Sequence, residues 1–155
     1  MILCGIFILN FIPLSKTGQP ASAKPEEDWT EIPPAQLVSS RDPSDLDAGM
    51  RIFQNKCALC HGKLGEGGAG PNLTDNYWKH GGDVSNLYNV ITKGVATTSM
   101  TPWETSVTPK ERLQLASFIL SLQGTNPQGA KEPEGEAWLT GGSNQDSEKS
   151  PAPMN

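Results

Sequence analysis

The stretch Cys57-Ala58-Leu59-Cys60-His61 decides how this chain is interpreted. Two cysteines three positions apart, followed at once by histidine, are the pattern for covalent attachment of a c-type haem. Residues i and i+3 share one face of a helix, so both thiols can reach the vinyl groups along one haem edge. The next residue, His61, can then turn its ring toward the iron as the proximal ligand. The motif therefore predicts one covalently attached haem c.

Two other interpretations of a C-x-x-C motif fit this chain less well. A thioredoxin-like redox pair needs a βαβ setting, and no strand pattern surrounds these cysteines. A structural zinc site needs four ligands, and Cys4 and His80 are the only further cysteine and histidine in the sequence. Haem attachment therefore remains the preferred interpretation.

The charges of the chain are unevenly placed. Its 155 residues leave room for one domain with flanking segments, and its formal net charge is −5. Between Asp45 and Gly124 seven basic residues balance seven acidic ones, so the acidic excess lies outside this region. No basic patch supports a nucleic-acid partner.

The first 14 residues are apolar but too short to span a bilayer, which takes about 20 residues. They lack the basic n-region of a signal peptide, although Ala21-Ser22-Ala23 resembles a cleavage site. The segment is thus either the end of a membrane anchor, which we prefer, or a signal peptide. Under both interpretations we expect the haem domain on the periplasmic side of the bacterial cytoplasmic membrane.

Helix signals predict an all-α domain over residues 44–124. It follows a Pro-rich acidic linker over residues 15–43 and precedes a disordered acidic tail over residues 125–155. A first helix is expected from Ser44 to Cys57, capped by Ser44 with Asp47 and burying a face that includes Met50. Two later helices are expected: Val84–Lys93, capped by Asp83, and a last one with Thr108, Pro109 and Glu111 at its start and Gly124 at its end.

These features resemble class I cytochrome c domains, in which a glycine and an aromatic residue on the first helix meet an aromatic residue on the last. Gly49, Phe53 and Phe118 match that pattern. The stretches 70–82 (GPNLTDNYWKHGG) and 116–127 (ASFILSLQGTNP) look like the C-terminal haem domain of the membrane-anchored cytochrome c subunit of C-type haem–copper oxidases. The resemblance covers about residues 46–133 and implies the class I cytochrome c fold. That subunit usually carries two haem motifs, whereas this chain has one.

A sixth iron ligand is expected from Met100, because it lies in a loop between helices where the chain can fold over the far haem face. His80 is the competing candidate. The resemblance implies that the proline of the loop, Pro71, accepts a hydrogen bond from the proximal histidine. Trp103 and Tyr77 or Trp78 are candidates to close the haem pocket and reach the propionates, although plain core packing explains these aromatic residues equally well.

With both axial positions filled, the expected function is single-electron transfer and not catalysis, so no catalytic residue is predicted. The resemblance implies a tethered subunit of a respiratory terminal oxidase. Its partners would be the oxidase core or another membrane complex, with a donor cytochrome or quinol-oxidising complex. One alternative is a free-standing membrane-tethered or periplasmic cytochrome that serves a reaction centre or dehydrogenase. Another is a haem enzyme or gas sensor with an open iron, which requires that Met100 does not bind.

Overall fold

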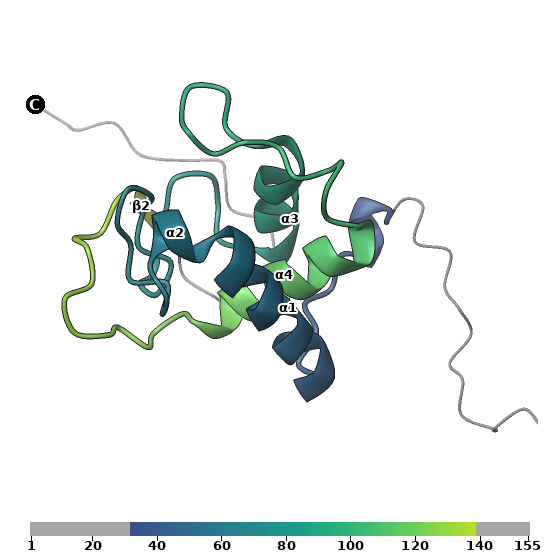
Figure 1. The fold of residues 1–155 in the computed structure, drawn as a ribbon, viewed down its shortest axis with the longest axis horizontal. Helices are drawn as coiled ribbons and strands as arrows, with labels where there is room; N and C mark the ends of the chain where they lie inside the picture. The colour runs from purple at the N-terminus through teal and green to yellow at the C-terminus, as the bar shows by residue number, and fades with distance from the viewer. Residues whose placement is uncertain (1–31, 139–155) are drawn as a thin grey trace, which may run out of the picture.

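The computed structural model describes residues 32–138, and Figure 1 shows helices packed around one centre within this range. The elements are η1 (Pro34–Gln36), α1 (Pro43–Lys56), α2 (Ala58–His61), β1 (Tyr77–Trp78), α3 (Val84–Lys93), α4 (Pro109–Ser121) and β2 (Glu136–Ala137). The two strands form one short antiparallel pair, with Tyr77 opposite Ala137. The mainly helical architecture confirms the predicted fold class.

Helices α1 and α4 cross at the middle of the domain (Figure 1). Gly49 lies at the crossing, where an added Cβ would meet the Gln114 carbonyl and come within 2.8 Å of Phe118 Cβ. Phe53 is fully buried beside it, and its ring packs against that of Phe118. A glycine in a helix interior costs about 1 kcal/mol relative to alanine. Here it permits a close backbone approach that a side chain would block.

The start of α1 differs from the sequence prediction. Asp42, not Ser44, is the N-cap, because its side chain accepts a hydrogen bond from the backbone N–H of Ser44 and Pro43 occupies the first turn. Asp47 instead pairs with Arg51 one turn later, at 2.7 Å. The predicted burial of Met50 is also wrong, since its side chain is 40% exposed.

The two later helices have the predicted caps. Asp83 accepts from the backbone N–H of Asn86 at the start of α3. At the start of α4, Thr108 and Glu111 form the expected capping box. Helix α4 ends at Ser121, three residues before Gly124, whose positive φ of 80° carries the chain away from the helix.

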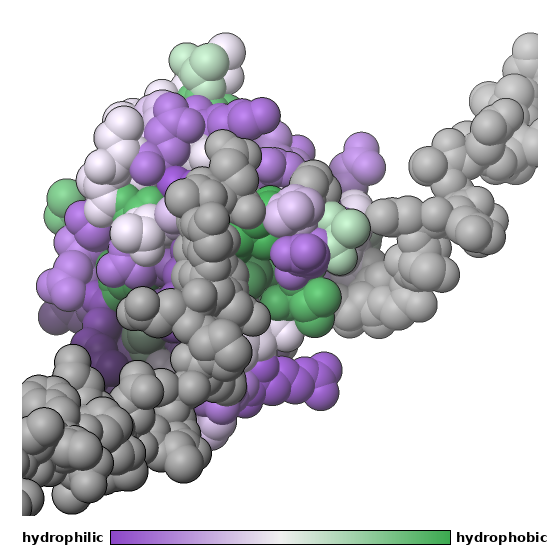
Figure 2. Space-filling view, turned by 90° about the vertical axis from the view of Figure 1, so that its right-hand side faces the viewer, coloured by the Kyte–Doolittle hydropathy of each residue, from purple (hydrophilic) through white to green (hydrophobic). Residues whose placement is uncertain are grey.

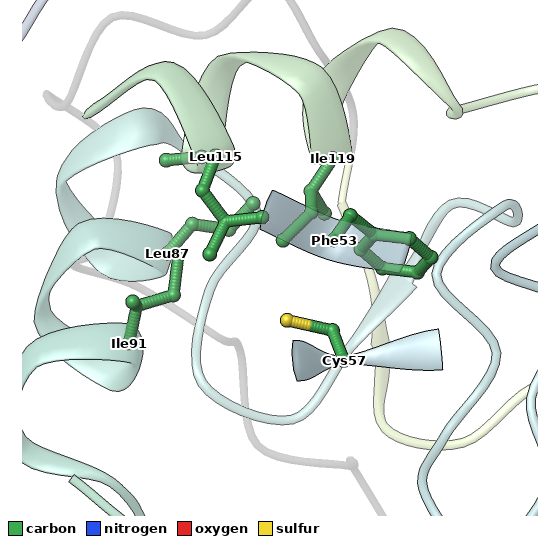
Figure 3. Close-up of a cluster of buried hydrophobic side chains, with 7 residues drawn as sticks. Phe53, Cys57, Leu87, Ile91, Leu115 and Ile119 are labelled. Carbon is green, nitrogen blue, oxygen red and sulfur yellow. The ribbon is translucent and has the colours of Figure 1, made fainter. Parts of the chain in front are cut away.

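The core joins α1, α3 and α4, as Figure 3 shows. Its buried side chains come from all three helices and from the residue between α1 and α2; they are Phe53, Cys57, Leu87, Ile91, Leu115, Ala116 and Ile119. The attachment motif therefore lies directly against the hydrophobic core.

Part of the predicted linker belongs to the folded unit. Leu37 is only 7% exposed, and the backbone N–H of Ser40 donates to Ser117 Oγ on α4 at 2.9 Å. The Ser40 hydroxyl also donates to Asp45 on α1. These contacts extend the domain on the N-terminal side of the predicted boundary at residue 44.

The prediction of a disordered tail is wrong for residues 125–138, which we call the C-terminal strap. The strap contributes β2 and packs against the loop that follows the attachment motif, where Lys131 N–H donates to the Glu66 carbonyl at 2.8 Å. Its contacts are mostly backbone hydrogen bonds, which a hydrophobic pattern does not reveal. The rest of the predicted tail and the N-terminal apolar segment lie outside the described residues.

No helix within residues 32–138 is long and apolar enough to cross a bilayer. Figure 2 shows hydrophobic residues on one face of the domain, interspersed with hydrophilic ones. Among the exposed large hydrophobic side chains is Leu59, between the two cysteines of the motif.

Candidate haem site

The two cysteines have different surroundings. Cys57 separates α1 from α2 and is buried, with its sulfur pointing toward the side chains of Leu87 and Leu115 in Figure 3. Burial raises the pKa of the Cys57 thiol to about 11, because a charged thiolate is poorly solvated there. Cys60 is only half-buried, one turn further along α2, and neither cysteine forms a disulfide. Both thiols are thus available for thioether bonds, and one faces the core.

The imidazole of His61 is fixed by a backbone carbonyl. Its Nδ1 lies 3.0 Å from the Pro71 carbonyl oxygen, the contact that the resemblance implies. Because a carbonyl only accepts, Nδ1 must carry the proton. Burial lowers the pKa of His61, and the Pro71 hydrogen bond opposes that change only in part. A neutral ring protonated at Nδ1 leaves the Nε2 lone pair for a metal.

Gly70 allows the loop to approach this ring. An added Cβ at Gly70 would lie 2.7 Å from Cε1 and 2.8 Å from Nδ1 of His61. The backbone N–H of Gly70 donates to the Cys60 carbonyl at 2.8 Å, and that of Gly67 to the His61 carbonyl at 2.7 Å. The loop therefore returns to the attachment helix and holds the proximal side of the site.

The aromatic candidates separate into inner and outer positions. Trp78 packs against the core cluster, whereas the next-door Tyr77 is 42% exposed. The indole Nε1 of Trp78 is buried without a hydrogen-bond partner in the described part of the chain. Trp103 also packs against the core, and Lys56 Nζ lies 5.2 Å from the centre of its ring. The roles of Tyr77, Trp78 and Trp103 at a haem pocket stay predictions.

Met100 lies in the loop between α3 and α4, half-buried. Its carbonyl accepts from Val95 N–H at 2.9 Å, and its own N–H donates to Thr98 Oγ1 at 3.1 Å. The loop is tied to α3 where Trp103 N–H donates to the Ile91 carbonyl. These bonds close the loop on itself, and the role of Met100 as an iron ligand stays a prediction. His80 is exposed.

These residues fit a haem c in three respects. Two free thiols three positions apart flank one helical turn, a neutral imidazole with a free Nε2 follows them, and apolar side chains surround Cys57. The unpaired Nε1–H of Trp78 is a buried donor suited to a propionate oxygen, since buried polar groups are normally hydrogen-bonded. Residues 32–138 contain no group of three or more His, Cys, Asp or Glu side chains that could hold a metal ion by themselves.

Sequence comparisons also indicate a c-type cytochrome. Residues 44–119 match the family model described as cytochrome C oxidase, cbb3-type, subunit III. Over 120 residues the chain is 38% identical to the cbb3-type cytochrome c oxidase subunit CcoP of Rubrivivax gelatinosus, covering 71% of this chain and 39% of that subunit. Over 83 residues it is 39% identical to cytochrome c-L of Methylorubrum extorquens, covering 52% of this chain and 42% of the relative.

A structural comparison agrees with the sequence matches. The crystal structure of cytochrome CL from Methylophaga aminisulfidivorans superimposes with a TM-score of 0.51 at 28% identity, covering 54% of this chain and 56% of that one.

Fold and site together define a class I cytochrome c domain, the class whose cofactor is haem c. Within that class the domain is of the kind found in subunit III of cbb3-type cytochrome c oxidases. The chain spans about two fifths of the length of the CcoP subunit that it matches.

Two features of the site escaped the sequence reasoning. One is the close contact of Gly70 with the imidazole, which is hidden among five glycines in the same loop. The other is Asn72, a buried side chain whose Oδ1 accepts two hydrogen bonds from Thr74. An asparagine two positions before a threonine in a Gly/Pro-rich loop is a signal for such a side-chain turn.

Proposed function

We propose that this domain carries one haem c, attached through Cys57 and Cys60, with His61 and Met100 as axial ligands. It transfers single electrons as a subunit of a cbb3-type terminal oxidase. The bound haem supplies the reversible one-electron chemistry of its iron. Its donor is a periplasmic cytochrome or a quinol-oxidising complex, and its acceptor is the oxidase core.

The observation that carries this proposal is the hydrogen bond between His61 and Pro71 beside two free thiols. The carbonyl fixes the tautomer and the direction of the ring, so the Nε2 lone pair is held ready to bind. Apolar side chains from α3 and α4 pack around Cys57. In the proposed site these side chains keep water away from the haem. Low solvent access is one of the means by which a protein tunes a redox centre.

Expression with a c-type haem attachment system tests the proposal. Intact-mass measurement should show one haem added by two thioether bonds, and the absorption spectrum should show a low-spin haem. A weak band near the red edge of the visible spectrum should report methionine ligation. High-spin iron would instead support an open-iron enzyme or sensor, and a chain without haem would refute the proposal.

A second candidate function is that of a free-standing electron carrier, which the similarity to cytochrome c-L favours. Purification from native membranes in mild detergent distinguishes the two functions. Recovery with an oxidase core supports the subunit, whereas recovery alone, or with a dehydrogenase, supports the free-standing carrier.

We further propose that the domain lies on the periplasmic side of the cytoplasmic membrane and is tethered through residues 1–14. Membrane fractionation followed by N-terminal sequencing tests this placement. A retained apolar segment in the membrane fraction agrees with a tether. A mature chain beginning at Lys24 would show a cleaved signal peptide instead.

A further inference from the structure

The C-terminal strap contacts the loop that follows the attachment motif, residues 62–79, which we call the proximal loop, at two points. At the first, Lys131 N–H donates to the Glu66 carbonyl at 2.8 Å, and the Lys131 carbonyl accepts from Asn72 Nδ2 at 3.1 Å. At the second, β2 pairs with β1 and Trp138 N–H donates to the Asn76 carbonyl at 2.7 Å. Pro71, the acceptor for His61, lies between Glu66 and Asn72, the two residues held at the first point.

Asn72 connects the strap to that acceptor. Its side chain is buried, at 6% exposure, and each end of its amide is used. Oδ1 accepts from the N–H and the hydroxyl of Thr74, while Nδ2 donates to the strap. The Pro71 carbonyl and the Asn72 N–H belong to one planar peptide unit. Fixing Asn72 therefore restricts the direction in which the Pro71 oxygen points.

The close packing of strap and loop depends on two glycines. An added Cβ at Gly67 would lie 2.8 Å from Lys131 Cβ and 3.0 Å from the Asn72 nitrogen. One at Gly135, in the strap, would lie 2.5 Å from the Trp78 carbonyl. Both glycines have positive φ, 93° and 106°, which a side chain would disfavour. The loop thus has a glycine, Gly67, at a close contact with the strap, and the strap has one, Gly135, at a close contact with the loop.

Charged side chains add to the second contact between the strap and the proximal loop. Glu134 of the strap lies 2.5 Å from Lys79 Nζ in the loop and 2.6 Å from Lys131 Nζ. The ammonium groups of Lys131 and Lys79 lower the pKa of Glu134 to about 2. The carboxylate is therefore ionised throughout the physiological range, and one of its two ion pairs crosses from strap to loop.

We propose that the strap, acting through Asn72, sets the direction of the Pro71 carbonyl and so the strength of the hydrogen bond that His61 donates. Asn72 and Lys131 are positioning residues for the proximal ligand. This inference rests on the proposed function, in which His61 binds the haem iron. A stronger hydrogen bond from Nδ1 makes the imidazole a more basic ligand, which favours oxidised iron. Loosening the strap should therefore raise the reduction potential.

A matched pair of substitutions at Lys131 tests the proposal in the full-length, haem-loaded protein. Lys131→Ala and Lys131→Pro both remove the ammonium group, but only proline removes the backbone N–H that binds the Glu66 carbonyl. We expect a higher potential in Lys131→Pro than in Lys131→Ala. We also expect the Nδ1 proton of His61 to exchange faster and shift its NMR resonance in the reduced protein.

A strap that merely covers the loop would lower thermal stability without moving the ring proton. Equal potentials and equal His61 resonances in the two Lys131 variants would therefore overturn the proposal. Asn72→Ala gives a second test if Lys131→Pro does not accumulate, and it should shift both quantities in the same direction. An unchanged potential in Asn72→Ala would likewise overturn it. Failure of the wild-type chain to bind haem would refute the proposed function instead, so the two failures are distinguishable.

Discussion

The rings of Phe53 on α1 and Phe118 on α4 have centroids 5.5 Å apart and planes inclined at 57°. Aromatic pairs at this distance and tilt contribute about 0.5–1.5 kcal/mol beyond the area that they bury. Gly49, one turn before Phe53, lets the two backbones come close enough for this contact. The crossing of the two helices thus depends on one small residue and one aromatic pair.

The first prediction concerns Gly49→Ala. Helix propensity alone would stabilise the protein by about 1 kcal/mol. The new Cβ would instead meet the Gln114 carbonyl, and overpacking of this kind typically costs about 1–3 kcal/mol. We expect net destabilisation, measured by denaturant unfolding of the haem-loaded protein. Met50→Ala, at an exposed neighbouring position, should change stability by less than about 0.5 kcal/mol. A more stable Gly49→Ala protein would contradict the close approach.

The second prediction concerns pH and Asp45. Hydrogen bonds from Ser40 and Gln114 hold the pKa of Asp45 below its ordinary value of 3.8. A depressed pKa in the folded state stabilises the protein above pH 3.8, and this contribution is lost as the pH falls through the lower folded value. The group is partly solvated, so we expect the contribution to be at most about 1 kcal/mol.

Denaturant midpoints of wild type and Asp45→Asn, measured from pH 6 down to pH 3, provide the check. The stability difference between them should be constant above about pH 5 and shrink toward acid. Asp47→Asn is the control, because its partner Arg51 lies on the same helix and both side chains are exposed. A difference between wild type and Asp45→Asn that does not change with pH would exclude an ionised Asp45 as the link between α1 and α4.

The third prediction concerns the distal ligand. Replacing Met100 with histidine should keep a six-coordinate, low-spin haem and lower the reduction potential, because imidazole favours oxidised iron more than a thioether does. Met100→Ala should open the iron to carbon monoxide while both thioether bonds stay intact. His80→Ala serves as the control and should leave the spectrum unchanged, since His80 is exposed. The opposite pattern, with carbon monoxide binding only in His80→Ala, would assign the sixth ligand to His80.

The fourth prediction concerns Gly70, which adjoins the proximal imidazole. Gly70→Ala would place a Cβ 2.8 Å from His61 Nδ1, so ring or loop must move, at a cost of about 1–3 kcal/mol. We expect a shifted His61 ring resonance in the reduced protein and a lower unfolding midpoint. Ala69→Ser changes the exposed neighbour and should affect neither quantity. A wild-type His61 resonance in Gly70→Ala would show that the loop yields without disturbing the ring.

Features that depend on local chemistry could be predicted from the sequence. Thr108, Pro109 and Glu111 act within one helical turn, and their capping box is present as expected. Asp83 caps α3 for the same reason. The predicted start of α1 at Ser44 is wrong, although Asp42 precedes Pro43 just as Thr108 precedes Pro109. A capping residue immediately before a proline at the first helical position therefore marks the start of both helices.

Features that depend on tertiary contact were harder to predict. The spacing of apolar residues placed Met50 in the core, but the buried face of α1 is centred on Gly49 and Phe53. The strap has the Pro-, Gly- and Glu-rich composition of a disordered segment. Its order comes from backbone hydrogen bonds to the proximal loop and from glycines at the points of closest approach. Single-sequence patterns do not report either of these.

The position of the strap in the sequence also affects the order in which parts of the domain form. Asn72 and its partner Lys131 are 59 positions apart, so during synthesis the proximal loop exists well before the strap that packs against it. Contacts over such separations form slowly, because the intervening chain must first lose its conformational freedom. The two thiols thus pass through a period in which the loop is not yet held down. We expect the strap to restrict this loop only after the whole attachment motif has been made.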